Sequence, residues 1–233
     1  MGIYEFAGCV VSYEPLYGLL RRRMETYRSD TEGQPDITLD GTKEDYEKLR
    51  KQYPHLSIEE CEYSCAGAEF YMKLLKHQGF MIHASAVEKE GKAYLFSAPS
   101  GTGKSTHAQL WRQTFKGEPI RIINDDKPAV CLQNGVFYAC GTPFSGKTDK
   151  NENRKAPIQG LCMLHRGKTN KIQKITSGEA LPLILPQTLF YGDEEETNLL
   201  LSFLDRFLQS VPVYKMECTK MPYLCGLWRF ANT

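Results

Sequence analysis

Residues 98–106 are Ala-Pro-Ser-Gly-Thr-Gly-Lys-Ser-Thr, and these residue types in this order can hold a phosphate group. Glycines let backbone N–H groups approach an anion where a helix begins, and a lysine supplies positive charge for the β- and γ-phosphate oxygens. The hydroxyl of Ser105 is a ligand that Mg²⁺ accepts. The residues that we expect to bind nucleotide are Pro99, Ser100, Gly101, Thr102, Gly103, Lys104, Ser105 and Thr106.

The common pattern for such a loop is Gly-x-x-x-x-Gly-Lys-Ser/Thr. In this chain Ala98 occupies the position of the first glycine, and a small residue is the substitution that this position tolerates. The alternative interpretation is a glycine-rich turn that only begins a helix. The register of Lys104 and Ser105 after an apolar run favours a phosphate site over this alternative.

Two acids follow a second apolar run. Residues 120–124 (IRIIN) predict a short buried strand, and Asp125 and Asp126 come directly after it, 21 and 22 residues beyond Lys104. Beside a phosphate loop, one acid can act at Mg²⁺ and the other can serve as general base for an attacking hydroxyl. The alternative is a β-turn in which aspartate and proline only shape the chain. The presence of the loop favours the catalytic interpretation.

Hydrophobic periodicity and turn residues predict the elements that position these groups. The predicted strands are 3–12, 79–87, 92–98, 120–124, 157–165 and 211–218, with hairpin turns at 88–91 and at Asn134-Gly135 within 129–140. The predicted helices are 42–53 (capped by Thr42), 66–78, 103–115 and 196–210. Residues 14–30 fit neither period. The fold class is therefore α/β with a mixed sheet, and we expect an N-terminal α+β layer (1–78) packed on a core unit (79–233).

Composition excludes some function classes. The 233 residues contain 29 Lys and Arg against 28 Asp and Glu, a formal charge of +1 that offers no global attraction to nucleic acid or to anionic lipid. No apolar run has the length of a membrane span, and the first residues lack the order of a signal peptide. The eight cysteines form no Cys-x-x-Cys pair and no zinc spacing. We expect a cytoplasmic protein without nucleic-acid or membrane partners.

Residues 79–165 resemble the HPr kinase/phosphorylase family, which is related to phosphoenolpyruvate carboxykinase. That family's nucleotide domain opens with a His-Gly strand, passes through a hairpin and enters the glycine-rich loop. The segment from His83 to Lys104 follows this plan, with Ala84 in place of the glycine, and CGTPF and APIQGLCML are similar to later family segments. The resemblance implies a mixed β-sheet P-loop nucleotide-binding fold of the HPr kinase/phosphoenolpyruvate carboxykinase type.

The resemblance also implies roles for individual residues. Asp125 matches the catalytic aspartate that deprotonates the acceptor serine, and Asp126 matches the second acid, which would hold Mg²⁺ together with Ser105. His83 matches a histidine near that centre and joins Asp125 and Lys104 in the expected catalytic set. A histidine in an apolar strand is more often a core residue, and this alternative stays open for His83.

Two positions depart from the family's pattern. Pro157 stands where the family has a glutamate, and Gln159 stands where it has an arginine. The N-terminal 78 residues do not resemble the N-terminal domain of the family's kinase. The chain therefore looks like one of the short HPr kinase-like proteins, some of which accompany peptide-modifying systems, and the implied acceptor is a peptide hydroxyl.

A basic segment, residues 141–157, lies between two predicted strands. Phosphoryl transfer needs cations around the transferred group, and Lys147 and Arg154 are candidates to supply them from a phosphate- or substrate-binding loop. The alternative is an ordinary solvated loop.

These features together predict a kinase that needs Mg²⁺ and ATP or GTP and transfers a phosphoryl group to a hydroxyl on a peptide, a protein or a small molecule. The rival hypothesis is a non-catalytic regulatory protein that only binds nucleotide, and Pro157 and Gln159 favour it. The sequence leaves open the acceptor, the choice of ATP or GTP, a reverse phosphorylase activity, homo-oligomerisation and the role of residues 1–78.

Overall fold

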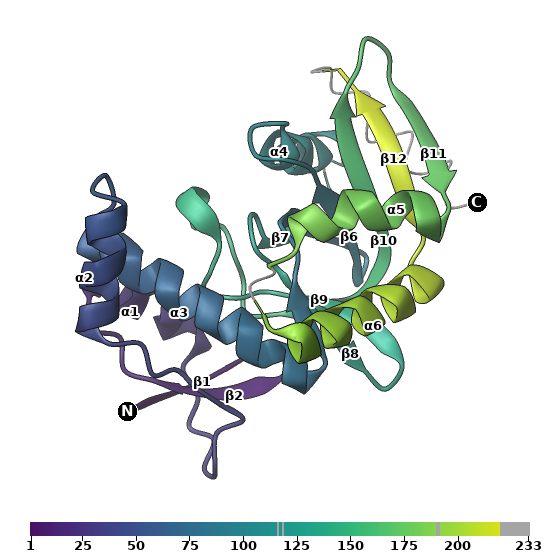
Figure 1. Cartoon of the computed structure of the whole chain (residues 1–233). Helices are drawn as coiled ribbons and strands as arrows, with labels where there is room; N and C mark the ends of the chain where they lie inside the picture. Colours follow the sequence, from purple (N-terminus) through teal and green to yellow (C-terminus); the bar gives the residue numbers. More distant parts are fainter. Residues whose placement is uncertain (116, 118, 190–191, 220–233) are drawn as a thin grey trace.

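The computed structural model describes residues 1–115, 117, 119–189 and 192–219; the other positions of the predicted 79–233 unit lie outside the described residues. In these ranges the chain has a mixed α/β fold, with a curled nine-stranded mixed sheet and a separate three-stranded sheet (Figure 1). No helix of this described part combines the length and the apolar character needed to cross a membrane.

The N-terminal layer consists of the small sheet and three helices. Its strands are β1 (Gly2–Phe6), β2 (Cys9–Tyr13) and β3 (Ile37–Thr38), and its helices are α1 (Gly18–Met24), α2 (Lys43–Gln52) and α3 (Ile58–Leu74). The predicted single strand 3–12 is wrong, because the chain turns back at Ala7 and Gly8. Both residues have left-handed φ angles (54° and 77°), as a two-residue hairpin turn requires.

Side-chain caps fix the starts of two helices in this layer. The predicted cap of α2 is confirmed, since Thr42 and Asp45 form a reciprocal capping box. Helix α3 begins at Ile58, well before the predicted residue 66, because Ser57 and Glu60 form a second capping box. It ends at Leu74, and a 3₁₀ turn follows.

The large sheet contains most of the predicted strands. Its members are β4 (Gly79–Met81), β5 (Ala84–Lys89), β6 (Lys92–Ser97), β7 (Ile120–Asn124), β8 (Ala129–Gln133), β9 (Val136–Cys140), β10 (Lys155–Arg166), β11 (Lys171–Ile175) and β12 (Val213–Cys218). The main path through the sheet is β4-β8-β9-β10-β6-β5-β7; β12 lies off this path and pairs with β10 and with β11. Strand β7 and the β8–β9 hairpin confirm their predictions, with Asn134 and Gly135 both at positive φ.

The predicted strand 79–87 is wrong in one respect, because it is two strands in separate parts of the sheet. Strand β4 pairs with β8, whereas β5 pairs with β6 and β7. Between them, the backbone N–H of His83 donates to the carbonyl of Gln187, at 2.7 Å. The chain therefore changes neighbours at His83, which places this residue at the end of the sheet near the loop after β6.

Strand β10 holds the two halves of the sheet together. Its first residues pair with β9 in the antiparallel sense, and its later residues pair in the parallel sense with β6 and β12. Pairing with β9 ends at Pro157, and within the pairing with β6 the register shifts between Ile158 and Gly160. The carboxyl ends of β6, β10 and β12 consequently lie at one edge of the sheet, the edge at which α/β proteins bind ligands.

Alternating side chains divide the core between the two faces of the sheet. On β10, Leu161 and Met163 contact α5 (Ser177–Ile184) and α6 (Glu194–Ser210), which lie together over one face (Figure 1). Cys162 and Leu164 belong to the opposite face, which is covered by Trp111 and its neighbours on α4 (Lys104–Thr114). Helix α5 and strand β11 were not predicted.

A third apolar cluster joins the N-terminal layer to the large sheet. Phe6, Tyr27 and Phe70 of the layer pack with Cys131 of β8 and with Phe144, which follows β9. All five side chains are almost fully buried. Residues on both sides of position 78 therefore share one core, and the predicted domain boundary at 78 stays a prediction.

Candidate functional site

The loop after β6 has the backbone that a phosphate site needs. Strand β6 ends at Ser97 and α4 begins at Lys104. Between them Gly101 and Gly103 have φ angles of 75° and 118°, which other residues rarely adopt, and no atom lies within 4 Å of the position that a Cβ would take on either glycine. The glycines therefore leave open space in front of the backbone at the N-terminus of α4.

Lys104 is largely enclosed, with 7% of its surface exposed. Its Nζ atom donates a hydrogen bond of 3.0 Å to the carbonyl of Ala98, at the start of the same loop. Burial lowers the pKa of Lys104, and the charges of Asp126 and Asp125 act in the opposite direction. The ammonium group is thus held at the start of the loop, and the nearby carboxylates of Asp125 and Asp126 supply negative charge.

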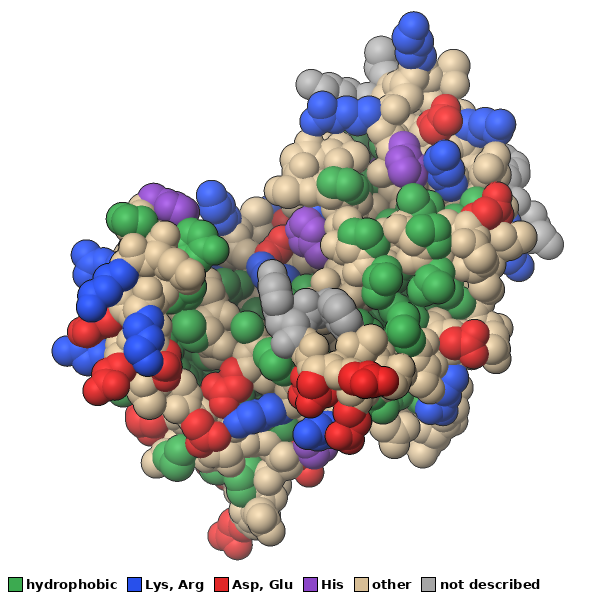
Figure 2. Space-filling view, in the orientation of Figure 1, with side chains coloured by type: hydrophobic (Ala, Val, Ile, Leu, Met, Phe, Trp, Pro, Cys, Tyr) green, Lys and Arg blue, Asp and Glu red, His purple; other side chains and the backbone are tan. Residues whose placement is uncertain are grey.

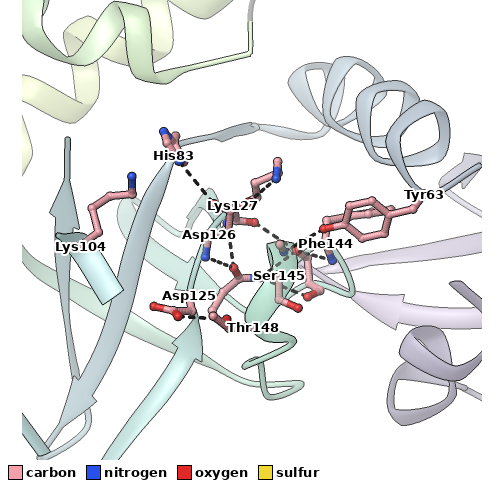
Figure 3. Close-up of polar contacts among 12 residues, drawn as sticks. Tyr63, His83, Lys104, Asp125, Asp126, Lys127, Phe144, Ser145 and Thr148 are labelled. Carbon is pink, nitrogen blue, oxygen red and sulfur yellow. Dashed lines mark hydrogen bonds and ion pairs between the residues drawn. The ribbon is translucent and has the colours of Figure 1, made fainter. Parts of the chain in front are cut away.

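Asp125 is buried at the end of β7, with 3% of its surface exposed. One carboxylate oxygen, Oδ1, accepts a hydrogen bond of 2.7 Å from the Ser85 hydroxyl, and the other, Oδ2, accepts one of 3.0 Å from Thr148 (Figure 3). Both contacts are with hydroxyl groups, and the carboxylate oxygens have further lone pairs that can accept another donor.

Asp126 is partly buried and contacts a histidine and a lysine. Its Oδ1 lies 3.3 Å from Nε2 of His83, and its Oδ2 accepts a hydrogen bond from Nζ of Lys127 (Figure 3). Burial alone raises the pKa of Asp126, but the bond to His83 and the charge and bond of Lys127 outweigh this and lower it to about 2. Asp126 is therefore an anion at neutral pH. His83 is oriented by a second contact, of 3.2 Å, between its Nδ1 and Oε1 of Gln187.

A buried amide that sequence reasoning missed holds the two acids in place. The Oδ1 atom of Asn124 accepts the backbone N–H groups of Asp126 and Lys127, and its Nδ2 donates to Thr142. The Thr142 hydroxyl also contacts Tyr71 of α3, at 2.8 Å. An asparagine directly before Asp-Asp is typical of an Asx-turn, and this local signal could have identified Asn124. The contact with Thr142 is tertiary and has no signal in the sequence.

The loop and the acids face one cleft of about 750 Å³. We call its two sides the core wall and the N-terminal wall. The core wall consists of Ser100, Ser105, Asp125, Asp126 and Lys127. The N-terminal wall consists of Leu19, Arg23, Leu56, Glu60, Tyr63 and Ser64. Figure 2 shows a notch between the N-terminal layer and the rest of the molecule, with acidic, basic and histidine side chains at its base.

A short loop joins the two walls, and we call residues 145–149 the joining loop. Its Gly146 is bound to the N-terminal wall twice, since Arg23 donates to its carbonyl at 2.8 Å and its N–H donates to the Tyr63 hydroxyl at 2.9 Å. Arg23 also pairs with Asp149, with Nε 3.2 Å from Oδ1. The N-terminal layer therefore fixes the position of the loop that carries Thr148 to Asp125.

The structure brings most, but not all, of the predicted site residues together. Lys147 of the joining loop lines the cleft with Ser105 and the two acids. Arg154 does not line it and instead pairs with Glu88 of β5, at 3.2 Å, and with Glu152. The segment 141–157 was predicted as one phosphate- or substrate-binding loop, but only its part around residues 145–148 reaches the cleft.

A second cavity, of about 720 Å³, adjoins the same loop and shares no lining residue with the cleft. It lies against Gly101–Gly103, the first turns of α4 and the carboxyl ends of β10 and β12. Arg166 of β10 donates to the carbonyl of Gly101, at 2.6 Å. His107 of α4 lines the cavity and is 3% exposed, and its two imidazole nitrogens have no hydrogen-bond partner among the described residues. Burial lowers the pKa of His107 to about 4, so its imidazole is neutral at pH 7.

The described residues contain no group of three or more His, Cys, Asp or Glu side chains arranged to hold a metal ion. The predicted Mg²⁺ ligands, Ser105 and Asp126, nevertheless line the same cleft. Mg²⁺ in phosphoryl-transfer sites commonly takes one or two protein carboxylates and completes its shell with substrate phosphates and water. A hydroxyl and an ionised carboxylate beside a phosphate loop fit that requirement.

Comparison with known proteins does not identify a family for the chain. No family model matches the chain, and no curated protein matches it. Among solved structures, the chain is similar to the Hpr(Ser) kinase/phosphatase from Coxiella burnetii, with 12% identity and a TM-score of 0.38, over 64% of this chain and 96% of that one. At this identity and TM-score the likeness assigns no family, activity or site to the chain.

Proposed function

We propose that the chain is a kinase that transfers the γ-phosphoryl group of ATP or GTP to a hydroxyl, in a P-loop fold of the HPr kinase type. One arrangement carries the proposal: Ser100 and Ser105 line the same cleft as the paired acids Asp125 and Asp126, and the buried Lys104 is hydrogen-bonded to Ala98 at the start of the glycine-rich loop. A loop that only began a helix would need neither a buried lysine nor two carboxylates opposite it.

Each charged residue has a defined task in this proposal. Backbone N–H groups at the start of α4 and the Lys104 ammonium bind the β- and γ-phosphate oxygens. Asp125 accepts the proton of the attacking hydroxyl, because it is held at the cleft with free lone pairs. Ser105 and Asp126 would hold Mg²⁺, which when bound would neutralise charge on the phosphate oxygens. His83 and Lys127 position the Asp126 carboxylate.

The second cavity gives the nucleotide a place for its remaining atoms. It begins at the loop and offers apolar contact with Leu110 and an unpaired imidazole on His107. We assign the nucleoside to this cavity and the acceptor hydroxyl to the cleft, so the phosphate chain would cross the loop between them. The N-terminal wall would then contact the acceptor.

The first experiment measures transfer from γ-labelled ATP and GTP with Mg²⁺, alone and with cell extract, for the wild type and for Asp125→Asn. Loss of a general base lowers the rate by about 10²- to 10⁴-fold. Asp205→Asn is the matched control, because Asp205 is exposed on α6 and remote from the cleft residues. We expect label on an extract component with the wild type and the control, and almost none with Asp125→Asn.

Two other results would replace the proposal. Nucleotide binding without transfer or hydrolysis, equal in the wild type and in Asp125→Asn across several extracts, would establish the regulatory alternative that only binds nucleotide. Absence of ATP and GTP binding by the folded wild type would mean that residues 98–106 form only a turn.

A further inference from the structure

The carboxylate of Asp125, the proposed general base, already holds two hydroxyl groups of its own chain. Ser85 donates to Oδ1 at 2.7 Å and Thr148 donates to Oδ2 at 3.0 Å, and Figure 3 shows Thr148 beside Asp125. A general base in a kinase accepts a proton from a hydroxyl at this kind of distance. Both hydroxyls therefore meet the first geometric condition for a phosphoryl acceptor.

The two hydroxyls differ in access. Ser85 is fully buried in β5, between β6 and β7, and it does not line the cleft. Thr148 is exposed and lines the cleft together with Ser100 and Ser105 of the phosphate loop. A phosphoryl donor bound at that loop can reach Thr148 through the cleft, whereas Ser85 is closed to it by burial within β5.

The fold holds Thr148 in this position from both ends of the joining loop. Gly146 is bound by Arg23 and Tyr63 of the N-terminal wall. Asp149 has a left-handed φ of 51° and is bound by Arg23, and its Oδ1 also accepts a hydrogen bond from Ser145. The neighbouring side chain, Lys147, lines the cleft and adds a cation beside the hydroxyl. An acceptor placed in this way needs no separate binding step.

We propose that the chain phosphorylates itself on Thr148, with Asp125 as the base and a nucleoside triphosphate bound at residues 98–106 as the donor. In this step a bond forms between Oγ1 of Thr148 and the γ-phosphorus. The bond from that phosphorus to the β–γ bridging oxygen breaks, and the nucleoside diphosphate leaves with the electron pair. The hydroxyl proton passes to the Asp125 carboxylate. The inference rests on the proposed kinase function and names an acceptor for it.

The modified loop cannot keep its present contact. Phosphothreonine carries nearly two negative charges at neutral pH, and Asp125 and Asp126 would repel it. The phosphorylated residue therefore leaves the carboxylate, and the position beside Asp125 becomes open to a hydroxyl from another molecule. Self-phosphorylation at Thr148 is in this way also a switch between an internal and an external acceptor.

The test incubates the purified full-length chain with Mg²⁺ and γ-labelled ATP or GTP, without extract, and locates phosphate by fragmentation mass spectrometry. We expect label on Thr148 in the wild type and on the serine of Thr148→Ser, and no label in Thr148→Val. In Asp125→Asn the rate should fall by about 100-fold or more. Ser85 should stay unmodified. The rate constant should not depend on protein concentration, because the transfer occurs within one chain.

The outcomes separate this inference from the proposed function. If the wild type labels an extract component while Thr148 stays unmodified, the kinase stands and the inference falls. Label that persists in folded Thr148→Val, or that lies on another residue, also overturns the assignment to Thr148. If the chain neither binds nucleotide nor transfers phosphate, both ideas fall. Circular dichroism of each variant checks that the fold is intact.

Discussion

The core wall and the N-terminal wall of the cleft differ in how their side chains are used. On the core wall the charged groups bind one another: Asp126 holds His83 and Lys127, and Asn124 fixes the turn below them. On the N-terminal wall, Arg23 and Tyr63 bind the backbone of Gly146. One wall thus concentrates charge, whereas the other sets the position of a loop. Substitutions on the two walls should therefore change different quantities.

The largest effect is expected from Lys104, the buried cation that is hydrogen-bonded to the phosphate loop. Lys104→Met removes the charge nearest the phosphate loop and should lower kcat/KM for phosphoryl transfer by about 10³-fold. The matched change across the cleft is Lys147→Met, which removes an exposed cation of the joining loop and should cost about fivefold or less. Steady-state kinetics of both variants measure the two losses in kcat/KM. Equal losses would show that Lys104 and Lys147 contribute equally to phosphoryl transfer.

Acid should weaken the core through His107. Because burial lowers the pKa of this histidine from its ordinary 6.5 to about 4, the unfolded chain binds one more proton than the folded chain between these values. Stability is therefore complete above pH 6.5, falls as the pH drops through this window, and has lost about 3 kcal/mol of unfolding free energy near pH 4.

The measurement for His107 is urea denaturation at several pH values for the wild type and for His107→Phe. The phenylalanine keeps an aromatic contact with Phe96, whose ring centre lies 4.3 Å from that of His107, and it cannot be protonated. The difference in stability between the two proteins should change by about 3 kcal/mol from pH 7 to pH 4. A constant difference would mean that His107 does not titrate in this way.

The smallest effect is expected on the N-terminal wall. Tyr63→Phe removes the hydroxyl that accepts the Gly146 N–H and should cost about 1 kcal/mol of loop ordering. Acceptor KM should rise about fivefold while nucleotide affinity stays the same. Tyr53→Phe is the control, because Tyr53 is exposed and does not line the cleft. A fall in nucleotide affinity in Tyr63→Phe would contradict a division of labour between the walls.

Sequence reasoning found the features of this molecule that are local. The order strand, glycine-rich loop and helix, and the strand that ends at Asp125, depend on neighbouring residues, and the predicted strand 120–124 is confirmed. The spacing of Ser57 and Glu60 is the sequence pattern of a capping box, and it predicts the start of α3 correctly. Helix α3 was missed there because the prediction rested on apolar residues that begin later.

The features that could not be predicted from the sequence depend on tertiary contacts. A continuous apolar run gives no sign that the chain leaves one neighbour for another at His83, so 79–87 was predicted as one strand. The roles of Arg23, Tyr63 and Thr148 come from contacts across 23 to 123 positions of the chain. No spacing rule within a single sequence connects such residues, and for this reason the N-terminal wall was not foreseen.

The shared apolar cluster of the N-terminal layer bears on how the chain is synthesised. Chains emerge amino end first, and early segments begin to fold while later ones are still being made. The apolar cluster that contains Phe6, Tyr27 and Phe70 is completed by later residues, among them Cys131 and Phe144. A nascent chain that stops before the β8–β9 hairpin therefore exposes an apolar surface to which chaperones and other chains can bind. The first 78 residues are synthesised early, but their apolar core is completed only after the β8–β9 hairpin has been synthesised.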